Sequence, residues 1–466
     1  MHTRDTETIQ ANSRTPTIAS ELGGSRTSPK NRPRVDRDDV ARPPIRSDIP
    51  IQRSSYKAGH IATVILRNIK NNGRAFDVRA HPPHIPRVMA FADVFPELLK
   101  RPTPLMRRFE RLLDEKTGGP LEDLAVSSRE LTRRNFGRTM RLFAPLYVSN
   151  ECVNNCKYCG FSRDAAILRT TLTVGQVVTE AKHLHGLGFR NILLVAGEHP
   201  KFVSDGYLQE CLDALKGFIP TLALEVGPME DHQYAEIVGH GAEGLVVYQE
   251  TYHRETYQQL HSAGPKKNFD WRLDCPERAY AGGFRRIGIG ALFGLANWKF
   301  EALALCAHLE YLYKQAWKAQ FTIAFPRMRP YAGNYQYQPD PNLYLPDKAF
   351  VRLIAVFRIL FPQAGIVVST REPAALRDAI ATLGVTHMSA GARTEPGGYT
   401  GAGAEDLHLT VKGRRVEIAD KSTADKATEQ FQIHDTRSPA EVAAMLRAQH
   451  LDPVWKDWDE SLLAVG

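Results

Sequence analysis

From residue 142 to residue 389, short apolar runs alternate with longer segments in which apolar residues recur every three or four positions. The short runs are typical of buried strands, and the longer segments are typical of amphipathic helices. The pattern predicts eight strands, over 142–149, 191–196, 222–226, 244–248, 286–291, 320–325, 365–369 and 386–389. It predicts helices between them, over 174–187, 208–218, 231–239, 276–281, 301–317, 347–360 and 374–382.

Regular alternation of strand and helix predicts an α/β fold with a parallel sheet. Eight such units in about 250 residues match a closed (βα)8 barrel of the TIM type, and an open doubly wound sheet is the alternative. Polar residues of possible function follow almost every predicted strand. This favours the barrel, because its active site lies at the carboxyl ends of the strands. We therefore predict a barrel over residues 142–395.

Segments with other patterns flank the predicted barrel. Residues 1–80 combine low hydrophobicity with many Arg, Ser, Pro and Asp residues, which predicts a disordered basic tail. Helical periodicity over 85–140 predicts N-terminal helices that cover one end of the barrel. Residues 396–466 form a C-terminal extension, and alternating residues around a glycine predict a hairpin-like insertion near 405–420. We interpret residues 400–435 as a peripheral insertion.

The chain has 466 residues, of which 43% are apolar, and a formal net charge of +8. The apolar content is normal for a globular protein with a sizeable core. Much of the positive charge lies in the tail, where acidic residues interrupt it, so a solvated extension is favoured over nucleic-acid binding. No apolar stretch is long enough to span a membrane, and the start lacks the apolar region of a secretory leader. We expect a cytoplasmic protein, with an organelle-targeting leader as the alternative.

Three of the six cysteines lie close together, as Cys152, Cys156 and Cys159 in a C-x3-C-x2-C pattern. Soft thiolate ligands favour zinc or an iron–sulfur cluster. A closed zinc site needs a fourth ligand, and the other cysteines are scattered singly. Three thiolates can instead hold a four-iron cluster whose last iron stays open for a substrate. A zinc-binding or redox-sensing cysteine protein is the non-enzymatic alternative.

The cysteine motif, with Tyr158 before its last cysteine, resembles that of the radical S-adenosylmethionine (SAM) enzymes. Further runs narrow the resemblance, at 144–150, 160–162, 194–199, 248–253, 325–330, 369–372, 396–399 and 453–459. In this order and spacing they are similar to the 2-iminoacetate synthases, which are the tyrosine lyases of thiamine thiazole biosynthesis. The resemblance covers roughly residues 85–466.

The resemblance implies two cofactors, a [4Fe–4S] cluster and SAM. Cys152, Cys156 and Cys159 would ligate three irons, and SAM would chelate the fourth. In the family, an electron from the reduced cluster cleaves the sulfonium and yields methionine and a 5′-deoxyadenosyl radical. The residues implied in SAM binding are Tyr158, Glu198, Glu225, Glu250, Arg272 and Gly290.

These residue types suit the groups that they would meet. The carboxylate of Glu198 suits the SAM ammonium group, and the guanidinium of Arg272 can bind a carboxylate through two hydrogen bonds. Tyr158 and Gly290 would lie beside the adenine. Glu225 ends an apolar strand, where a purely structural acid would need a buried partner, and we expect it to contact the SAM ribose or amine. Ordinary packing or surface ion pairs are the alternatives for Tyr158, Arg272 and Gly290.

The resemblance also implies L-tyrosine as the substrate. The radical would take a hydrogen from the substrate amine, and cleavage of the Cα–Cβ bond would release p-cresol and 2-iminoacetate. Arg371 is the expected clamp for the substrate carboxylate, and Arg327 and Arg329 compete for this role. Tyr147 and Ser389 are expected at the same barrel mouth.

The implied partners are thiazole synthase, which would receive the easily hydrolysed imine, and a flavodoxin- or ferredoxin-type reductant. No nucleic acid or membrane is expected as a partner. The closest alternative is the tyrosine lyase of [FeFe]-hydrogenase maturation. That enzyme needs further cysteines for a second cluster, and no cysteine follows Cys306. A tryptophan lyase is a second alternative, which only the depth of the pocket and its polar end could separate.

Overall fold

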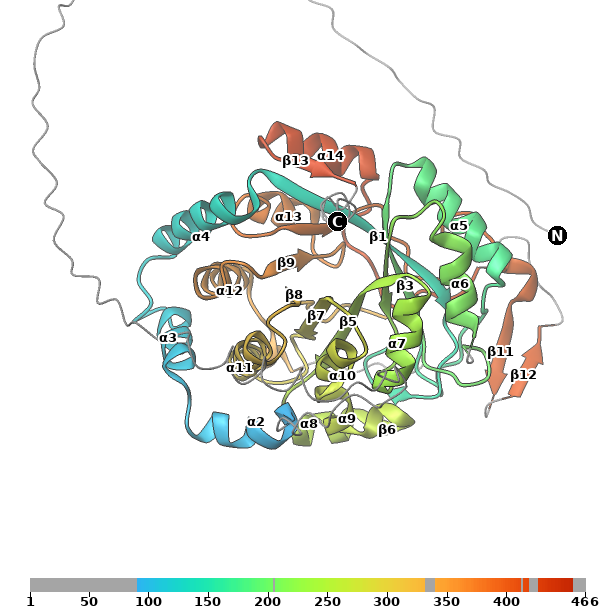
Figure 1. Cartoon of the computed structure of the whole chain (residues 1–466), viewed down its shortest axis with the longest axis horizontal. Coiled ribbons are helices and arrows are strands. Elements are labelled where there is room, and N and C mark those ends of the chain that lie inside the picture. The colour runs from blue at the N-terminus through green and yellow to red at the C-terminus, as the bar shows by residue number, and fades with distance from the viewer. Residues whose placement is uncertain (1–89, 204–205, 332–339, 412–413, 419–425, 456–466) are drawn as a thin grey trace, which may run out of the picture. The chain divides into compact units, whose positions relative to one another are not determined.

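Eight parallel strands close into a barrel in the computed structural model (Figure 1). The structure describes residues 90–203, 206–331, 340–411, 414–418 and 426–455, and the predicted tail lies outside them. Strand β10 pairs with β1 through Arg141–Phe143, and this pairing closes the predicted (βα)8 barrel. The strands are β1 Thr139–Ser149, β3 Asn191–Ala196, β4 Thr221–Glu225, β5 Ala242–Glu250, β7 Arg286–Ala291, β8 Gln320–Ala324, β9 Gly365–Val368 and β10 His387–Ser389.

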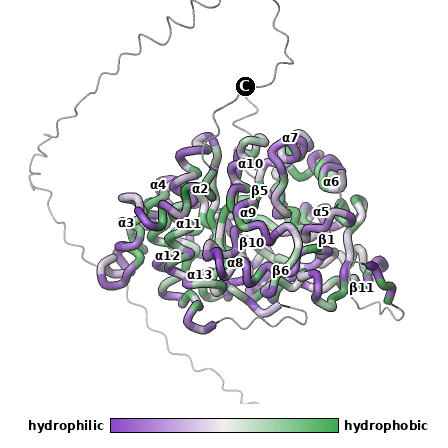
Figure 2. Tube along the Cα trace, turned by 90° about the horizontal axis from the view of Figure 1, so that it is seen from below, coloured by the Kyte–Doolittle hydropathy of each residue, from purple (hydrophilic) through white to green (hydrophobic). Residues whose placement is uncertain are grey.

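Seven helices between these strands lie within a few residues of their predicted positions. Side-chain caps fix where several of them begin: Thr173 and Gln176 form a capping box on α5, and Asn297 accepts two backbone N–H groups of α11. Along these helices apolar and polar residues alternate (Figure 2), as expected for helices with one face on the barrel. The helices are α5 Val174–Gly186, α6 Tyr207–Leu215, α7 Asp231–Gly239, α10 Cys275–Ala281, α11 Trp298–Gln315, α12 Asp347–Leu360 and α13 Ala374–Ile380.

Three N-terminal helices, α2 Phe91–Lys100, α3 Pro104–Leu113 and α4 Leu121–Phe136, pack along α11 and α12 on the outside of the barrel. Gly384 lets α4 approach, since a side chain there would meet the Ser128 hydroxyl at 2.8 Å. The sequence predicts that these helices cover one end of the barrel. Of the three, only α4 reaches such a position: its last residues, Asn135 and Phe136, line a cavity at the amino ends of the strands. No helix in the described ranges is long and apolar enough to cross a membrane.

Several further elements were not predicted. Except for the ten-residue helix Pro439–Ala448, they are only two to seven residues long and stand outside the regular strand–helix alternation. Strand β13, Asp452–Val454, pairs with the start of β1 outside the barrel. A hairpin of β11 His408–Val411 and β12 Arg414–Glu417 stands where the sequence predicts one. The remaining elements are β2 Asn155–Cys156, α8 Arg254–Leu260, β6 His261–Ala263, α9 Phe269–Leu273, α14 Pro439–Ala448 and three short 3-10 turns, η1 Pro265–Lys267, η2 Pro341–Leu343 and η3 Ala404–Asp406.

After the hairpin the chain crosses the carboxyl ends of the barrel strands as a strap, residues 426–435. Its backbone bonds the loop after β1, through Thr428 N–H to Leu168 C=O at 2.9 Å and Gly160 N–H to the strap carbonyl of residue 430 at 3.2 Å. It also bonds the loops that follow β8, β9 and β10. The interpretation of residues 400–435 as peripheral is wrong for the strap, because its backbone bonds the loops at the mouth of the barrel. The strap was missed because its sequence shows no pattern that points to this position.

The far end of the strap is anchored by a buried charge. The carboxylate of Asp435 is paired with Arg377, and both side chains are fully buried. Arg377 also donates to the carbonyl of Ser389 at the end of β10. The anchor therefore joins the strap to the rim of the barrel.

Replacing Asp435 with Asn should destabilise the protein by about 3–5 kcal/mol, because the buried Arg377 guanidinium would lose its anionic partner. Asp378→Asn is the matched control, since Asp378 is a third exposed and pairs with Arg437 at the surface. Its loss should cost less than about 1 kcal/mol. Urea titrations give the free energy of unfolding of both variants. Equal losses in the two variants would contradict the proposed anchoring role of Asp435.

Candidate active site

A pocket opens at the carboxyl ends of the barrel strands, under the strap. Seven of the predicted site residues line it together, from β1, β4, β5, β9, β10 and the cysteine loop. They are Tyr147, Tyr158, Cys159, Glu225, Glu250, Arg371 and Ser389. Lys266, Tyr248, Gln430 and Phe431 line it as well and were not predicted. Eight parallel strands thus bring residues that are far apart in sequence to one rim.

The three cysteines lie on the loop after β1 and are free thiols, with Cys156 buried and the other two partly exposed. The buried guanidinium of Arg169 holds this loop by donating to the carbonyls of Asn150 at 2.6 Å and Ser162 at 2.7 Å. Sequence reasoning missed this arginine, because a single basic residue in a loop carries no pattern.

A glycine after β3 lets the cysteine loop pack closely on the neighbouring strand. A side chain at Gly197 would lie 2.2 Å from the carbonyl oxygen of Glu151 and 3.2 Å from Cβ of Cys152. The backbone N–H of Val153 also donates to the Glu198 carbonyl at 2.7 Å. The cysteine loop is therefore held both by Arg169 and by the residues that follow β3.

The donor set of this loop fits an iron–sulfur cluster better than one metal ion. In the described part of the chain, no three His, Cys, Asp or Glu side chains converge on a point where a single ion could sit. A four-iron cluster takes its thiolates on separate irons, so its ligands need not converge. Burial raises the pKa of the Cys152 and Cys156 thiols, although Lys266 opposes this at Cys156. Iron binding must therefore displace protons from them.

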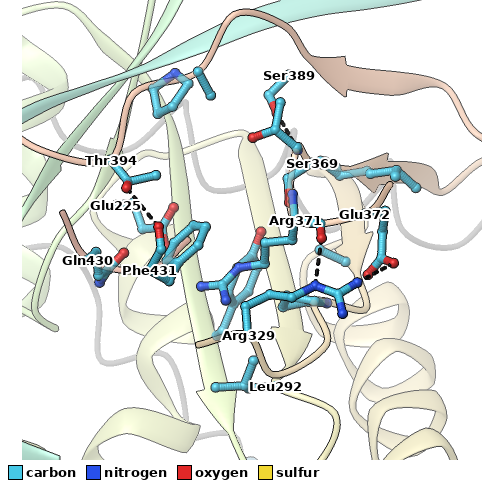
Figure 3. Close-up of a pocket in the computed structure, with 18 of the residues that line it drawn as sticks. Glu225, Leu292, Arg329, Ser369, Arg371, Glu372, Ser389, Thr394, Gln430 and Phe431 are labelled. Carbon is cyan, nitrogen blue, oxygen red and sulfur yellow. Dashed lines mark hydrogen bonds and ion pairs between the residues drawn. The ribbon is translucent and has the colours of Figure 1, made fainter. Parts of the chain in front are cut away.

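Arg371 brings a positive charge to this pocket without an ion-pair partner among the described residues. Its guanidinium lies flat on the ring of Phe431, with Cζ 3.3 Å from the ring centroid, and points into the pocket (Figure 3). Within the described residues it has no ion pair and no side-chain hydrogen bond. Burial lowers its pKa, and the nearby Tyr147 and Glu225 oppose this shift. A half-buried guanidinium without an ion pair favours a carboxylate ligand.

The two competing arginines are already occupied. Arg327 is almost fully buried and is bonded to Glu372, to Asp347 at 2.6 Å and to the Leu345 carbonyl at 3.0 Å. Arg329 turns to Glu372 at 2.8 Å and donates to the backbone carbonyl of residue 371 at 2.6 Å (Figure 3). Arg327 and Arg329 therefore hold the loops around the pocket together.

Tyr147 and Ser389 lie buried in the same pocket. The Tyr147 hydroxyl donates to Oε1 of Gln430 at 2.8 Å. Ser389 Oγ accepts the backbone N–H of Thr370 at 3.1 Å, so its own proton remains available to a ligand.

Two acids on neighbouring strands are in different states. Burial acts to raise the pKa of Glu250, but Lys266 at 2.6 Å and Arg272 at 3.4 Å bring it below its usual value. Glu225 has no hydrogen-bond partner among the described residues, and burial, together with the charge of Glu250, raises its pKa to about 7. Glu250 is therefore ionised, while Glu225 can gain or lose a proton near neutral pH.

Glu250 also has an unusual backbone. It ends β5 with φ of 71°, a conformation that is rare for a residue with a side chain. Since such strain persists only where the surroundings fix it, the position indicates a functional constraint at this strand end.

Three predicted cofactor-binding residues do not line the pocket. Arg272 donates to the Tyr248 carbonyl at 2.7 Å and pairs with Glu250. Glu198 lines a neighbouring cavity and accepts from Asn154 at 2.7 Å. Gly290 lies behind Tyr248, whose ring would be 2.8 Å from any side chain placed there. The structure gives Gly290 a packing role.

Replacing Glu225 with Gln should make the stability of the cluster-free protein less dependent on pH. The folded carboxyl has a pKa near 7 against an ordinary 4.5, so the folded state binds a proton that the unfolded chain has already lost. The wild-type carboxyl therefore costs more stability as the pH rises from about 5 to about 8, and Gln removes this cost. Unfolding free energies of both proteins at the two pH values measure it, and an unchanged difference would contradict the assignment.

The model of the radical SAM superfamily matches residues 146–306, and the model of the biotin and thiamin synthesis associated domain matches residues 324–452. The 2-iminoacetate synthase of Escherichia coli (strain K12) is 39% identical over 352 residues, which are 75% of this chain and 86% of that protein.

A similar relative and a solved structure agree with these matches. The 2-iminoacetate synthase of Salmonella typhimurium is 38% identical over the same shares of both chains. The crystal structure of HydG, a maturase of the [FeFe]-hydrogenase, superposes with a TM-score of 0.65 at 29% identity and covers 78% of each chain. The sequence identity, its coverage and the cysteine loop agree, and the chain belongs to the 2-iminoacetate synthase family of radical SAM enzymes.

Proposed function

We propose that this protein cleaves the Cα–Cβ bond of L-tyrosine and releases 2-iminoacetate and p-cresol. The observation that carries the proposal is the half-buried guanidinium of Arg371, which has no anionic partner among the described residues and lies in one pocket with the cluster ligand Cys159. A partly buried charge of this kind favours an anionic ligand, and the carboxylate of an amino acid supplies one.

As a radical SAM protein the chain uses a [4Fe–4S] cluster and SAM, and Cys152, Cys156 and Cys159 would hold the cluster. When bound, the pair supplies a 5′-deoxyadenosyl radical that takes a hydrogen atom from the substrate. The protein would hold SAM through Glu250, whose charge is fixed by two cations, and through Glu225 on the next strand.

Further SAM contacts are proposed on the two sides of this pair of acids. The ring of Tyr158, whose hydroxyl is hydrogen-bonded to His261 at 2.7 Å, would lie beside the adenine, in front of Gly290. Glu198 would receive the SAM ammonium group from the adjoining cavity, and Arg272 would act by orienting Glu250.

The substrate would bind opposite the cysteine loop. Arg371 would bind the carboxylate of tyrosine through two N–H groups, and the Ser389 hydroxyl would donate a further hydrogen bond. Tyr147 would contact the amino acid from β1. The strap closes the pocket above these groups and would keep water from the reacting atoms.

Two partners are proposed on chemical grounds. The product 2-iminoacetate hydrolyses readily in water, so transfer to a thiazole synthase would protect it. A flavodoxin- or ferredoxin-type protein is the proposed reductant. A tryptophan lyase is the alternative within the same chemistry. Product analysis after incubation with each amino acid would distinguish the two.

Replacing Arg371 with Lys should uncouple the reaction, because lysine keeps the charge but loses the paired N–H groups. A charged hydrogen bond is worth roughly 1.5–3 kcal/mol, so tyrosine affinity should fall by about ten- to a hundredfold. The loosely held substrate should yield little p-cresol while 5′-deoxyadenosine still forms. Quantifying both products from anaerobically reconstituted enzyme, SAM, reductant and tyrosine measures this.

Arg329→Lys is the matched control for this variant, since Arg329 is paired with Glu372. Its p-cresol yield per 5′-deoxyadenosine should stay near the wild-type value. Normal coupling in Arg371→Lys together with lost coupling in Arg329→Lys would transfer the clamp to Arg329.

Replacing Cys156 with Ala should abolish the visible absorbance of the cluster and SAM cleavage, because two thiolates retain a cluster poorly. Cys306→Ala is the control, since Cys306 is fully buried in α11 and far from the loop in sequence. Iron and sulfide analysis after reconstitution should show a normal cluster in this control. Loss of the cluster in the Cys306 variant would contradict the ligand assignment.

A further inference from the structure

Gln430 of the strap lies between the cysteine loop and the substrate pocket. Its Nε2 is 3.7 Å from Sγ of Cys159, and its Oε1 accepts the hydroxyl of Tyr147 at 2.8 Å. One amide thus contacts both a proposed cluster ligand and a proposed substrate residue.

The chemistry of these partners fixes the direction of both hydrogen bonds. A thiolate that ligates iron can only accept, so the N–H₂ end of the amide must face Cys159. The carbonyl end then faces Tyr147, whose hydroxyl must donate. Reversing the amide would place a carbonyl oxygen against a thiolate and would lose the bond to Cys159, while the Tyr147 hydroxyl would have to accept instead of donate.

The backbone around Gln430 holds this amide in place. The N–H of residue 430 donates to the Thr394 carbonyl at 2.9 Å, and its carbonyl accepts from Gly160 at 3.2 Å. Gly160 directly follows Cys159, and a side chain there would lie 2.4 Å from the carbonyl oxygen of residue 430. Only glycine lets the strap approach the cysteine loop so closely.

Other groups near this contact do not offer the same hydrogen bond. Within the described residues, Gln430 is the side chain with a hydrogen bond to a sulfur of the cysteine loop. Phe431, the next strap residue, stacks on Arg371. The strap therefore touches the cluster ligand and the carboxylate clamp through two consecutive residues.

We propose that Gln430 is a positioning residue that raises the reduction potential of the cluster through an N–H···S hydrogen bond to Cys159, with Tyr147 orienting the amide. Reduction adds one electron to the cluster and increases the negative charge on its sulfur ligands. An N–H dipole that points at such a sulfur stabilises the reduced form more than the oxidised form, and hydrogen bonds to the sulfurs are known determinants of cluster potential.

This inference rests on the proposed cluster site, and the experiment separates the two. Wild type, Gln430→Leu and the control Gln432→Leu are reconstituted anaerobically, and their iron content is measured. Gln432 belongs to the same strap, but its side chain is exposed. The potential is then measured by a dithionite titration followed by the electron paramagnetic resonance signal of the reduced cluster, without SAM or tyrosine.

The equilibrium constant for one-electron reduction should fall roughly two- to tenfold in Gln430→Leu, the effect of one hydrogen bond. At 59 mV per decade this is about 20–60 mV toward more negative potential. Gln432→Leu should match the wild type. A full cluster with an unchanged potential in Gln430→Leu would overturn the inference and leave the proposed function standing, whereas a wild type without a cluster would overturn the proposed function itself.

Tyr147→Phe provides a second test in case Gln430→Leu does not retain its cluster. It leaves the strap intact and removes only the hydroxyl that orients the amide. Its potential should also move to more negative values, by less than in Gln430→Leu. A potential equal to that of the wild type would contradict the proposed role of Tyr147, and without a measurable Gln430 variant it would overturn the inference.

Discussion

Charge that is partly withdrawn from water at the mouth of the barrel is the main physical constraint on the pocket and on the loops around it. Closing eight parallel strands brings their carboxyl ends to one rim, where Glu225, Glu250 and Arg371 lie half-buried. Each buried charge needs a partner or must change its protonation state. Glu250 has two cations and stays ionised, while Glu225 has none and its pKa rises to about 7. Arg371 has an aromatic ring but no ion pair among the described residues, which leaves its guanidinium available to an anionic ligand.

The same constraint explains why the loops around the pocket are tied down so heavily. Arg327 and Arg329 share Glu372, and Arg169 gathers the carbonyls of the cysteine loop. In these contacts the arginines around the pocket are bonded to protein groups, so they do not compete for a ligand in the pocket. A rigid set of loops keeps each reacting group in place, which matters because small misplacements are costly in rate.

The barrel could be predicted from the sequence because its strands and helices are long enough to show their periods. Residues at strand ends followed from it, and Tyr147, Arg371 and Ser389 do meet in one pocket. The strap could not be predicted, since it is held by backbone hydrogen bonds and by single side chains such as Asp435 and Gln430, which leave no periodic pattern in the sequence. Lys266 was missed for a similar reason: it lies in the short turn η1 and reaches Glu250 only through the fold. The occupied state of Arg327 and Arg329 likewise became visible only with their partners.

We propose that the guanidinium of Arg371 is reserved for the carboxylate of the substrate. An anaerobic crystal structure of the reconstituted protein with SAM and L-tyrosine is the decisive measurement. The tyrosine carboxylate is expected within hydrogen-bond distance of the Arg371 guanidinium, with Arg327 and Arg329 still on Glu372. A carboxylate bound to Arg329, with Arg371 still stacked on Phe431 and without an anionic partner, would contradict it.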